Sequence, residues 1–367
     1  RKVPLTNYED DLVEALAEGR GPDIFATQNF WRPKHENKIS PLPQEVMTLR
    51  EYQERFVDVV EGDYIDPEDN QIYGIPLYTD SLALFYNRDA FNDAGFATAP
   101  ESWDEFVNYS NELTFIANDG QIEQAGVAMG TATNVNRPQD IVAVLMLQSG
   151  AQMNNPDNPN ETTFTRNVNV DGVEVNPAAS ALEFYTNFAN PRFSTYTWNA
   201  SLDYSTDAFI EREAAMMLGY SYHVDLIKAR NPRLNFEVAP LPQISEIGKA
   251  NYANYWGYSV SIQSQNPTEA WQFLKFITEP ENSQNYFLQT KRPTPRQDLI
   301  EVQRDDPEYG VFVDQLLQAK TWVQPDNGVV DEVFQNMITD VNRGILTPTQ
   351  AVSQAQREIN IITEGSR

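Results

Sequence analysis

The chain has 367 residues, of which 41% are hydrophobic and 11% aromatic, a composition typical of a globular protein. This length exceeds one ordinary core, so two domains are expected. The formal net charge of -27 argues against a nucleic acid partner, since binding one requires clustered Lys and Arg. The absence of cysteine excludes disulfides, thiolate nucleophiles and Cys-ligated zinc or iron–sulfur sites.

The first residues are typical of the interior of a chain rather than of its start. No apolar stretch reaches the roughly 18 residues of a membrane span, and no signal peptide pattern is present. Lys2 to Leu5 resemble a strand, and Arg1 is an unusual first residue. We therefore expect the natural start of the protein to lie upstream.

The predicted elements alternate between helix and strand, which favours an α/β fold. Ser102 is a good cap for a helix that follows it, and Thr347 with Pro348 for the last helix. The Asn- and Pro-rich segment 154–175 suits a surface hairpin. Helices are predicted over 8–17, 103–116, 140–148, 177–189, 206–217 (running into a buried strand), 267–277, 282–288, 309–320, 331–343 and 347–363, with strands starting at 23 and 73 and covering 236–239 and 257–262.

Signatures of catalysis or cofactor binding are weak. His35 and His223 are the two histidines, and no HExxH motif occurs, so a metal centre is poorly supported. "GYSYH" (219–223) lacks the small residues of a nucleophile elbow, and no spacing singles out a pair among the 53 acids. "GRGPDI" lacks the third glycine of a dinucleotide fingerprint, and "NNPDNPNET" lacks the EF-hand spacing. No cofactor is expected.

Aromatic residues instead gather at predicted strand ends and loops. In α/β folds, the loops at the carboxyl ends of strands form the ligand crevice. A flat ring can cover the C–H face of a sugar while nearby amides and carboxylates bind its hydroxyls. Core packing remains the alternative for each ring taken singly. The set comprises Trp31, Tyr78, Tyr220, Tyr222, Trp256 and Trp322.

Four blocks in order make the sequence similar to the extracellular solute-binding proteins of ABC importers, in the sugar-binding group called family 1. They are "YEDDLVEALAEGRGPDIF", "YGIPLYTDSLALFYNRDAFNDAGFATAPESWDEF", "AFIEREAAMMLGYSYHV" with "FEVAPLP", and a C-terminal pair, "YSVSIQSQNPTEAWQFLKFITEPENSQNYFLQTKRPTPR" and "GILTPTQAVSQAQREIN". Glu213 stands where the family commonly has glycine. The family's opening strand and helix, with its signal peptide and any lipid-anchor cysteine, are missing, so a gap in the first lobe's sheet is expected.

The resemblance implies the two-lobed periplasmic-binding-protein-like fold of type II, with a cleft between the lobes and hinge crossings. We place the crossings near 79–81, 255–258 and 320–324. One lobe is then expected to comprise 1–80 and 257–320, and the other 81–256 and 321–367.

The resemblance also implies ligand-binding positions. Asp80 would stand at a crossing, where a sugar binder of this family carries an acid that contacts ligand; a capping or hinge hydrogen bond is the alternative. Gln28 and Asn29 follow the "PDIF" strand, at the family's other common contact loop, and a plain turn is their alternative. Arg292 either reaches the cleft or, as we favour, is a solvent-exposed side chain on a loop. The predicted ligand-binding set is Gln28, Asn29, Trp31, Tyr78, Asp80, Tyr220, Trp256 and Trp322.

The function implied is capture of a mono- or oligosaccharide and its delivery to the membrane permease of an ABC importer, without catalysis. The protein is expected to be an extracytoplasmic monomer, lipid-anchored in its precursor. The same fold binding a glycerophosphodiester, polyamine or peptide is the alternative, and a glycoside hydrolase is less favoured. A phosphate ligand would need arginine in the site, and only Arg32 and Arg292 are candidates.

Overall fold

The computed structural model describes residues 7–170, 172–244 and 248–365, so the strand expected over 2–5 lies outside the described residues. By its backbone contacts the chain divides into two compact units. Unit 1 comprises Arg1–Thr79 and Asn254–Gln303, and unit 2 comprises Asp80–Ala253 and Arg304–Arg367. No helix among the described residues has the length and apolar character that crossing a membrane requires.

Unit 1 is built on an antiparallel sheet in the order β1-β13-β2, formed by Ile24–Gln28, Trp256–Val260 and Ile75–Pro76. The register pairs Gln28 with Trp256, which brings two segments far apart in sequence to one end of the sheet. Within the described residues β1 is an edge strand, paired with β13 alone. The helices of this unit are α1 (Tyr8–Ala17), α2 (Arg32–His35), η2 (Glu36–Lys38), α3 (Leu49–Arg55), α4 (Asp58–Tyr64), α11 (Pro267–Ile277), α12 (Pro280–Thr290), η3 (Gln297–Leu299) and α13 (Ile300–Gln303).

One glycine of β13 is required by close packing beneath the sheet. A Cβ atom on Gly257 would lie 2.5 Å from the hydroxyl oxygen of Tyr64, well inside contact distance. That hydroxyl donates to the carbonyl of Thr27 on β1, and the Tyr64 side chain is fully buried. Gly257 therefore lets α4 pack against the sheet directly beside Trp256.

Unit 2 is built on a five-stranded sheet in the order β11-β3-β10-β5-β4, in which β10 and β5 are parallel and the other pairs antiparallel. Every residue of β3 and β10 is buried, which explains their continuous apolar sequences. The strands are β3 (Ala83–Asn87), β4 (Phe115–Ile116), β5 (Ile122–Val127), β10 (Ala214–Gly219) and β11 (Phe236–Ala239), with the small pairs β6 (Asn154–Asn155) and β7 (Asn158–Thr162), β8 (Val168–Val170) and β9 (Val173–Val175), β12 (Asn251–Tyr252) and β14 (Ala319–Lys320).

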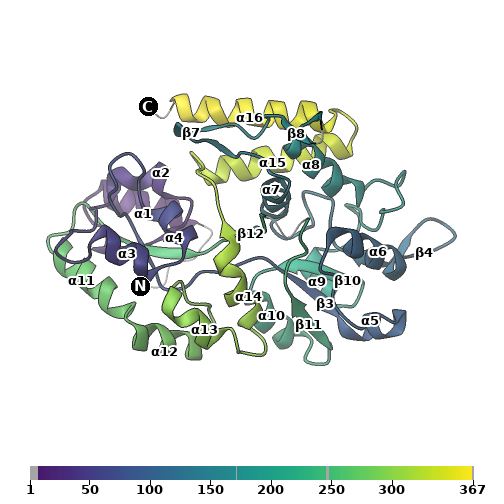
Figure 1. The fold of residues 1–367 in the computed structure, drawn as a ribbon, viewed down its shortest axis with the longest axis horizontal. Coiled ribbons are helices and arrows are strands. Elements are labelled where there is room, and N and C mark those ends of the chain that lie inside the picture. Colours follow the sequence, from purple (N-terminus) through teal and green to yellow (C-terminus); the bar gives the residue numbers. More distant parts are fainter. Residues whose placement is uncertain (1–6, 171, 245–247, 366–367) are drawn as a thin grey trace. The chain divides into compact units, whose positions relative to one another are not determined.

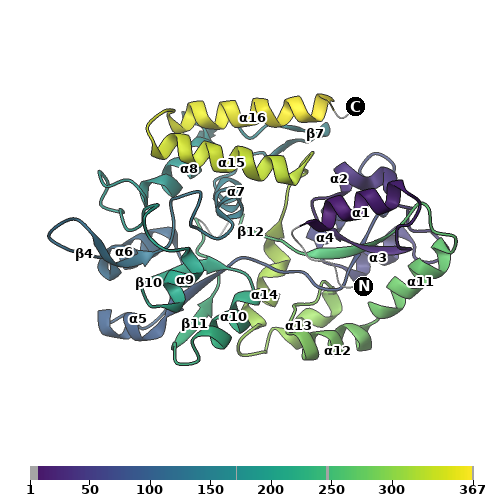
Figure 2. The ribbon, with the colours of Figure 1, turned by 180° about the vertical axis from the view of Figure 1, so that it is seen from behind.

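Figures 1 and 2 show a group of long helices, α7, α8, α15 and α16, gathered on one side of unit 2. Helix α7 is buried over most of its length, whereas α15 and α16 lie side by side at the surface. The helices of unit 2 are α5 (Arg88–Ala94), α6 (Trp103–Leu113), α7 (Pro138–Gln148), α8 (Pro177–Asn187), α9 (Ser205–Ile210), α10 (Tyr222–Arg230), α14 (Gly310–Asp314), η4 (Gln315–Gln318), α15 (Asn327–Asn342) and α16 (Pro348–Gly365).

Local capping signals agree with the structure. The Ser102 hydroxyl accepts a hydrogen bond from the Glu105 amide at the start of α6, and the Thr347 hydroxyl accepts one from Gln350 at the start of α16. Gly95 ends α5 in the left-handed conformation, with φ of +81°, which a residue without a side chain adopts readily. The polar segment 154–175 forms two small hairpins rather than one.

Three helix predictions were wrong in extent. The helix expected over 103–116 ends at Leu113, and residues 115–116 form the strand β4. The other two depart further from the prediction. The helix expected over 206–217 ends at Ile210, because residues 214–219 form the buried strand β10 between β3 and β5. The helix expected over 309–320 is broken into α14, the 3-10 turn η4 and the strand β14. In both places, sheet pairing and burial override local helical periodicity.

The segment 304–320 groups with unit 2 by its backbone contacts, although the sequence predicted it in the first lobe. The Tyr309 hydroxyl donates to Asp225, the Phe312 ring contacts Phe85, and the Gln315 amide oxygen accepts from Leu241. These contacts fix α14 and η4 to the central sheet of unit 2. The chain therefore passes between units at 303/304 rather than near 320.

Candidate functional site

The loop after β1 is a buried structural connection. The Asn29 amide nitrogen donates to the Asp63 carboxylate, its side-chain oxygen accepts from the Tyr255 backbone N–H, and its own backbone N–H donates to the Tyr255 carbonyl. Asn29 is 1% exposed. Gln28 is also buried and donates to Asn254 at 3.4 Å. Asn29 therefore ties β1 to the start of β13 and α4, a role beyond the plain turn considered from the sequence.

Three aromatic rings of unit 1, which we call the indole face, meet where β1 ends and β13 begins. Trp31 stacks on Tyr8 with a centroid distance of 6.0 Å, and Trp256 meets Trp31 edge-on at 5.1 Å. Trp256 is half-buried, whereas Trp31 is 4% exposed. The indole N–H of Trp31 is buried and has no hydrogen-bond partner within residues 7–170, 172–244 and 248–365. An unsatisfied buried donor requires an explanation, and a ligand oxygen would provide one.

The two arginines considered for a phosphate ligand are already engaged. The Arg32 guanidinium donates to Glu36 and to Asp66, the latter at 2.7 Å. The Arg292 guanidinium lies 5.2 Å from the centre of the Tyr78 ring, in a cation–π arrangement. Tyr78 is half-buried. Neither arginine offers a dedicated anion site in unit 1.

Asp80 acts in the structure as a helix cap. Its carboxylate accepts hydrogen bonds from the backbone N–H of Ser81, from the backbone N–H of Ser221 at 3.1 Å, and from the Ser221 hydroxyl at 2.6 Å. Ser221 immediately precedes α10, so the carboxylate stands at the positive end of that helix. Asp80 is 1% exposed. The capping alternative is what this geometry shows, and a ligand contact by Asp80 stays a prediction.

The loop after β10 turns Tyr220 inward and Tyr222 outward. Tyr220 is 2% exposed and donates its hydroxyl to the Asp140 carboxylate at 2.7 Å. Tyr222 is 38% exposed and stacks on the ring of His223. The Asp80 cap fixes this loop through Ser221. The accessible ring of this loop is therefore Tyr222, which belongs to the set of aromatics at predicted strand ends but not to the predicted ligand-binding set.

The exposed surface around Tyr222 contains residues that the sequence reasoning missed. The Asn136 side chain accepts from the Tyr204 hydroxyl at 3.2 Å and reaches the Tyr222 hydroxyl at 3.5 Å. Burial raises the pKa of Tyr204 and raises that of Tyr222 to about 12, and the Arg137 guanidinium opposes both shifts. One sequence signal was available: Arg137 directly precedes Pro138 at a helix start. We call Asn136, Arg137, Tyr204, Tyr222 and Asp331 the tyrosine face.

Trp322 packs inside unit 2. Its ring lies 6.3 Å from that of Phe164 and 6.0 Å from that of Phe334, and it is 6% exposed. Yet its indole N–H has no partner, and neither has the side-chain oxygen of Gln324 two residues on. The Gln324 amide nitrogen donates to the Tyr252 hydroxyl. This segment thus holds one buried donor and one buried acceptor that the described chain does not satisfy.

No serine-nucleophile arrangement occurs at "GYSYH". The Ser221 hydroxyl donates to Asp80, while Nδ1 of His223 accepts from the Tyr220 backbone N–H at 3.1 Å. Burial lowers the pKa of His223 to about 4, so the ring is neutral. Across the described ranges, no group of three or more His, Asp or Glu side chains is placed to hold a metal ion.

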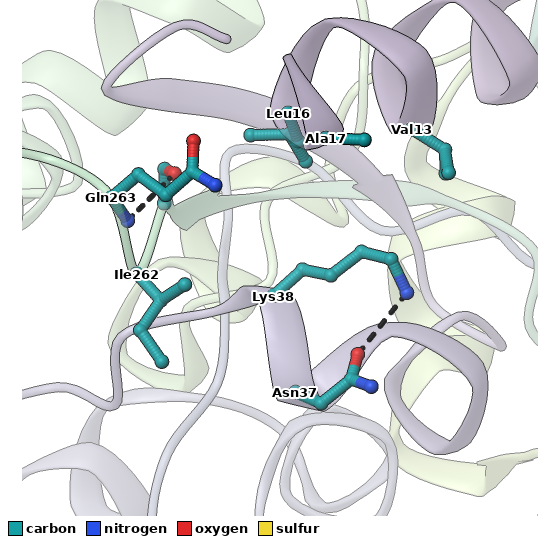
Figure 3. Close-up of a pocket in the computed structure, with 8 residues that line it drawn as sticks. Val13, Leu16, Ala17, Asn37, Lys38, Ile262 and Gln263 are labelled. Atoms are coloured by element: carbon teal, nitrogen blue, oxygen red, sulfur yellow. Dashed lines mark hydrogen bonds between the residues drawn. The ribbon is translucent and has the colours of Figure 1, made fainter. Parts of the chain in front are cut away.

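A small groove in unit 1 lies away from these residues. Figure 3 shows its lining by Val13, Leu16 and Ala17 of α1, by Asn37 and Lys38, and by Ile262 and Gln263 beyond the end of β13. It sits at the amino-terminal end of β1, whereas the indole face sits at the other end of that strand. None of the predicted ligand-binding residues lines it.

The fold is that of the MalE-type solute-binding proteins. The chain superimposes on the sugar-binding protein MalE from Xanthomonas citri with a TM-score of 0.79, at 20% identity over 100% of this chain and 90% of that one. It superimposes on UgpB from Mycobacterium tuberculosis, solved with glycerophosphocholine, with a TM-score of 0.78, at 17% identity over 99% and 89%. A binding protein of Brucella abortus is 20% identical, covering 88% of this chain and 73% of that protein.

Residues 2–309 match the family described as bacterial extracellular solute-binding proteins. The chain belongs to that family. The resemblance, the α/β fold class and the solute-binding function expected from the sequence are confirmed. The individual ligand-binding residues stay predictions.

Proposed function

We propose that the protein binds a carbohydrate without catalysing a reaction. The observation that carries this is a set of buried side-chain donors and acceptors that find no partner among the described residues. Trp31 and Trp322 each hold an unpartnered N–H donor, and Gln139 and Gln324 each hold an unpartnered oxygen acceptor. A sugar hydroxyl both donates and accepts, and sugar C–H faces pack on rings such as Trp256 and Tyr222.

The mode of action we propose follows from the two units. Ligand bound by residues of both units would favour a closed arrangement, through rotation at the chain passages 79/80, 253/254 and 303/304. A Kd in the micromolar range corresponds to a binding free energy of about 8 kcal/mol, which one or two stacked rings and several hydrogen bonds supply. Delivery to an ABC permease, an extracytoplasmic location, lipid anchoring of the precursor and a monomeric state belong to the same proposal.

A non-sugar solute is the second candidate, and the likeness to UgpB with glycerophosphocholine supports it. A phosphodiester needs cationic donors directed at it. Arg32 is paired with two carboxylates and Arg292 lies over Tyr78, so the described residues favour the sugar.

A thermal-shift screen against mono- and oligosaccharides tests the proposal. A ligand that binds only the folded state at 100 times its Kd stabilises it by about 2.7 kcal/mol, which raises the melting temperature. We expect at least one neutral sugar to do so, and chromatography of the incubated sugar should show no turnover. A panel in which only glycerophosphodiesters or polyamines shift the melting temperature would favour the second candidate.

A further inference from the structure

The start of α7 places one guanidinium between two carboxylates in unit 2. The Arg137 Nε and Nη2 atoms each donate to Asp140 at 2.9 Å, and Nη1 lies 3.6 Å from the Asp331 carboxylate. Asp140 is buried, while the side chains of Arg137 and Asp331 are each 25% exposed. Arg137 has a φ of +51°, an uncommon conformation for a large side chain. One cation and two carboxylates give this group a formal charge of -1.

An unsatisfied acceptor lies beside the more exposed carboxylate. Gln139 is 7% exposed, and its side-chain oxygen finds no hydrogen-bond partner among the described residues. Burial raises the pKa of Asp331 to about 6; Arg137 opposes this shift, as does a hydrogen bond from the Gln139 side chain. A buried acceptor without a donor is costly, and an ordered water or a ligand hydroxyl would supply the missing donor.

The surroundings suit a sugar ring. Tyr204 and Tyr222 are 41% and 38% exposed and are joined through the side chain of Asn136. Asn136 directly precedes Arg137 in the chain, so the hydrogen bonds of both tyrosines end at the residue next to the charged group. Two exposed rings, held at Asn136, and two acceptors, the Gln139 oxygen and the Asp331 carboxylate, thus gather at the start of α7.

We infer that Gln139 and Asp331 form an acceptor subsite that binds hydroxyl groups of an uncharged carbohydrate and discriminates against anionic ligands. The inference rests on the proposed function and narrows its ligand class. A hydroxyl supplies the donor that both acceptors require. A phosphate or carboxylate supplies none and would face two carboxylates, with the guanidinium already directed at them.

The test uses calorimetric titration with two neutral probes, maltotetraose and mannotriose, and one anionic probe, sn-glycerol 3-phosphate. Asp331→Asn removes the charge at nearly constant shape, and Gln139→Met removes the acceptor at similar volume. Glu332→Gln is the matched control, because it removes one charge from the exposed neighbouring position on α15. We expect each of the first two variants to weaken binding of a neutral probe roughly 10-fold, since a charge-assisted or buried hydrogen bond is lost. Melting temperatures of the unliganded variants show that they fold.

The outcomes separate the two proposals. Wild-type binding of a neutral probe, with loss in Asp331→Asn and Gln139→Met but not in Glu332→Gln, supports both. Equal neutral-probe binding by all four proteins overturns the subsite and leaves the sugar-binding function standing. Tighter binding of sn-glycerol 3-phosphate than of either sugar overturns the discrimination against anions. Absence of binding to any sugar overturns the proposed function, and the subsite with it.

Discussion

One part of the Trp256 ring packs against other aromatic rings, and the rest is exposed to solvent. Trp31 and Tyr8 meet it edge-on at 5.1 and 5.8 Å, yet the side chain is only half-buried. Its strand neighbour Gly257 makes room for Tyr64 on the other side of the sheet. The remaining exposed part of the ring is what a ligand can cover, so packing and ligand binding are compatible at this residue.

Trp256→Ala should weaken sugar binding on the order of 30- to 100-fold, because a stacked ring covers roughly 100 Å² of apolar surface, worth about 2–3 kcal/mol. The unliganded protein should lose little stability, since the ring is only partly packed. Titration and melting of this variant measure the two effects. A large fall in melting temperature with sugar affinity intact would assign Trp256 to the core of unit 1, where a packed tryptophan contributes about 3–5 kcal/mol.

His223 should make the stability of the protein depend on pH. Its pKa falls from 6.5 to about 4 on folding because of burial, so the folded protein holds it neutral. The contribution of neutral His223 to the free energy of unfolding is fully present above pH 6.5. It is lost as the pH falls towards 4, by up to about 3 kcal/mol. Carboxylates titrate in the same pH range, so the acid loss of stability has to be compared between the wild type and a variant. His223→Asn is suitable, because its side-chain oxygen can still accept a hydrogen bond from Tyr220. Urea unfolding at pH 7 and pH 4.5 should show a smaller acid loss in the variant, and equal losses would contradict the assignment.

At the scale of elements, the connection between β10 and α10 is fixed from another part of the chain. The carboxylate of Asp80, which lies just before β3, accepts hydrogen bonds from the backbone N–H and the hydroxyl of Ser221. A Cβ atom on Gly219 would lie 2.9 Å from Nδ1 of His223, so the glycine lets this helix start close to the strand. The outward direction of Tyr222 depends on these two positions.

Asp80→Ala should destabilise unit 2 by about 1–3 kcal/mol, because buried donors of Ser221 are left unsatisfied. Asp80→Asn retains an acceptor and should lose less. Asn87→Ala removes the cap of α5, away from the tyrosine face, and is the matched control for a general capping effect. We expect sugar affinity to fall in the Asp80 variants and to be unchanged in Asn87→Ala. Identical affinities in all of them would mean that the cap does not position Tyr222.

At the scale of the molecule, three chain passages join the two units, at 79/80, 253/254 and 303/304. Each unit has its own sheet and its own aromatic face: the indole face in unit 1 and the tyrosine face in unit 2. A chain organised in this way can respond to a ligand by moving whole units while each core stays intact.

Saturating sugar should reduce the radius of gyration of the protein, because the proposed mode of action has the ligand favour a closed state. Small-angle scattering with and without the sugar identified in the screen measures this. Trp256→Ala at the same sugar concentration, below its own Kd, should keep the unliganded radius. An unchanged radius for the saturated wild type would count against closure.

The sequence alone determined the class of this protein. Ordered blocks such as "YGIPLYTDSLALFYNRD" resemble the solute-binding family, and that resemblance implied the fold. The helices 8–17 and 267–277 and the strand 236–239 have the predicted bounds, because capping and periodicity are set by neighbouring residues. Tertiary structure decided where side chains point. Burial turned Tyr220 towards Asp140 and left Tyr222 exposed, although both share the same five-residue segment. The tyrosine face joins residues near 136, 204, 222 and 331, and only long-range packing of α7, α15 and the loop after β10 could bring such distant positions together.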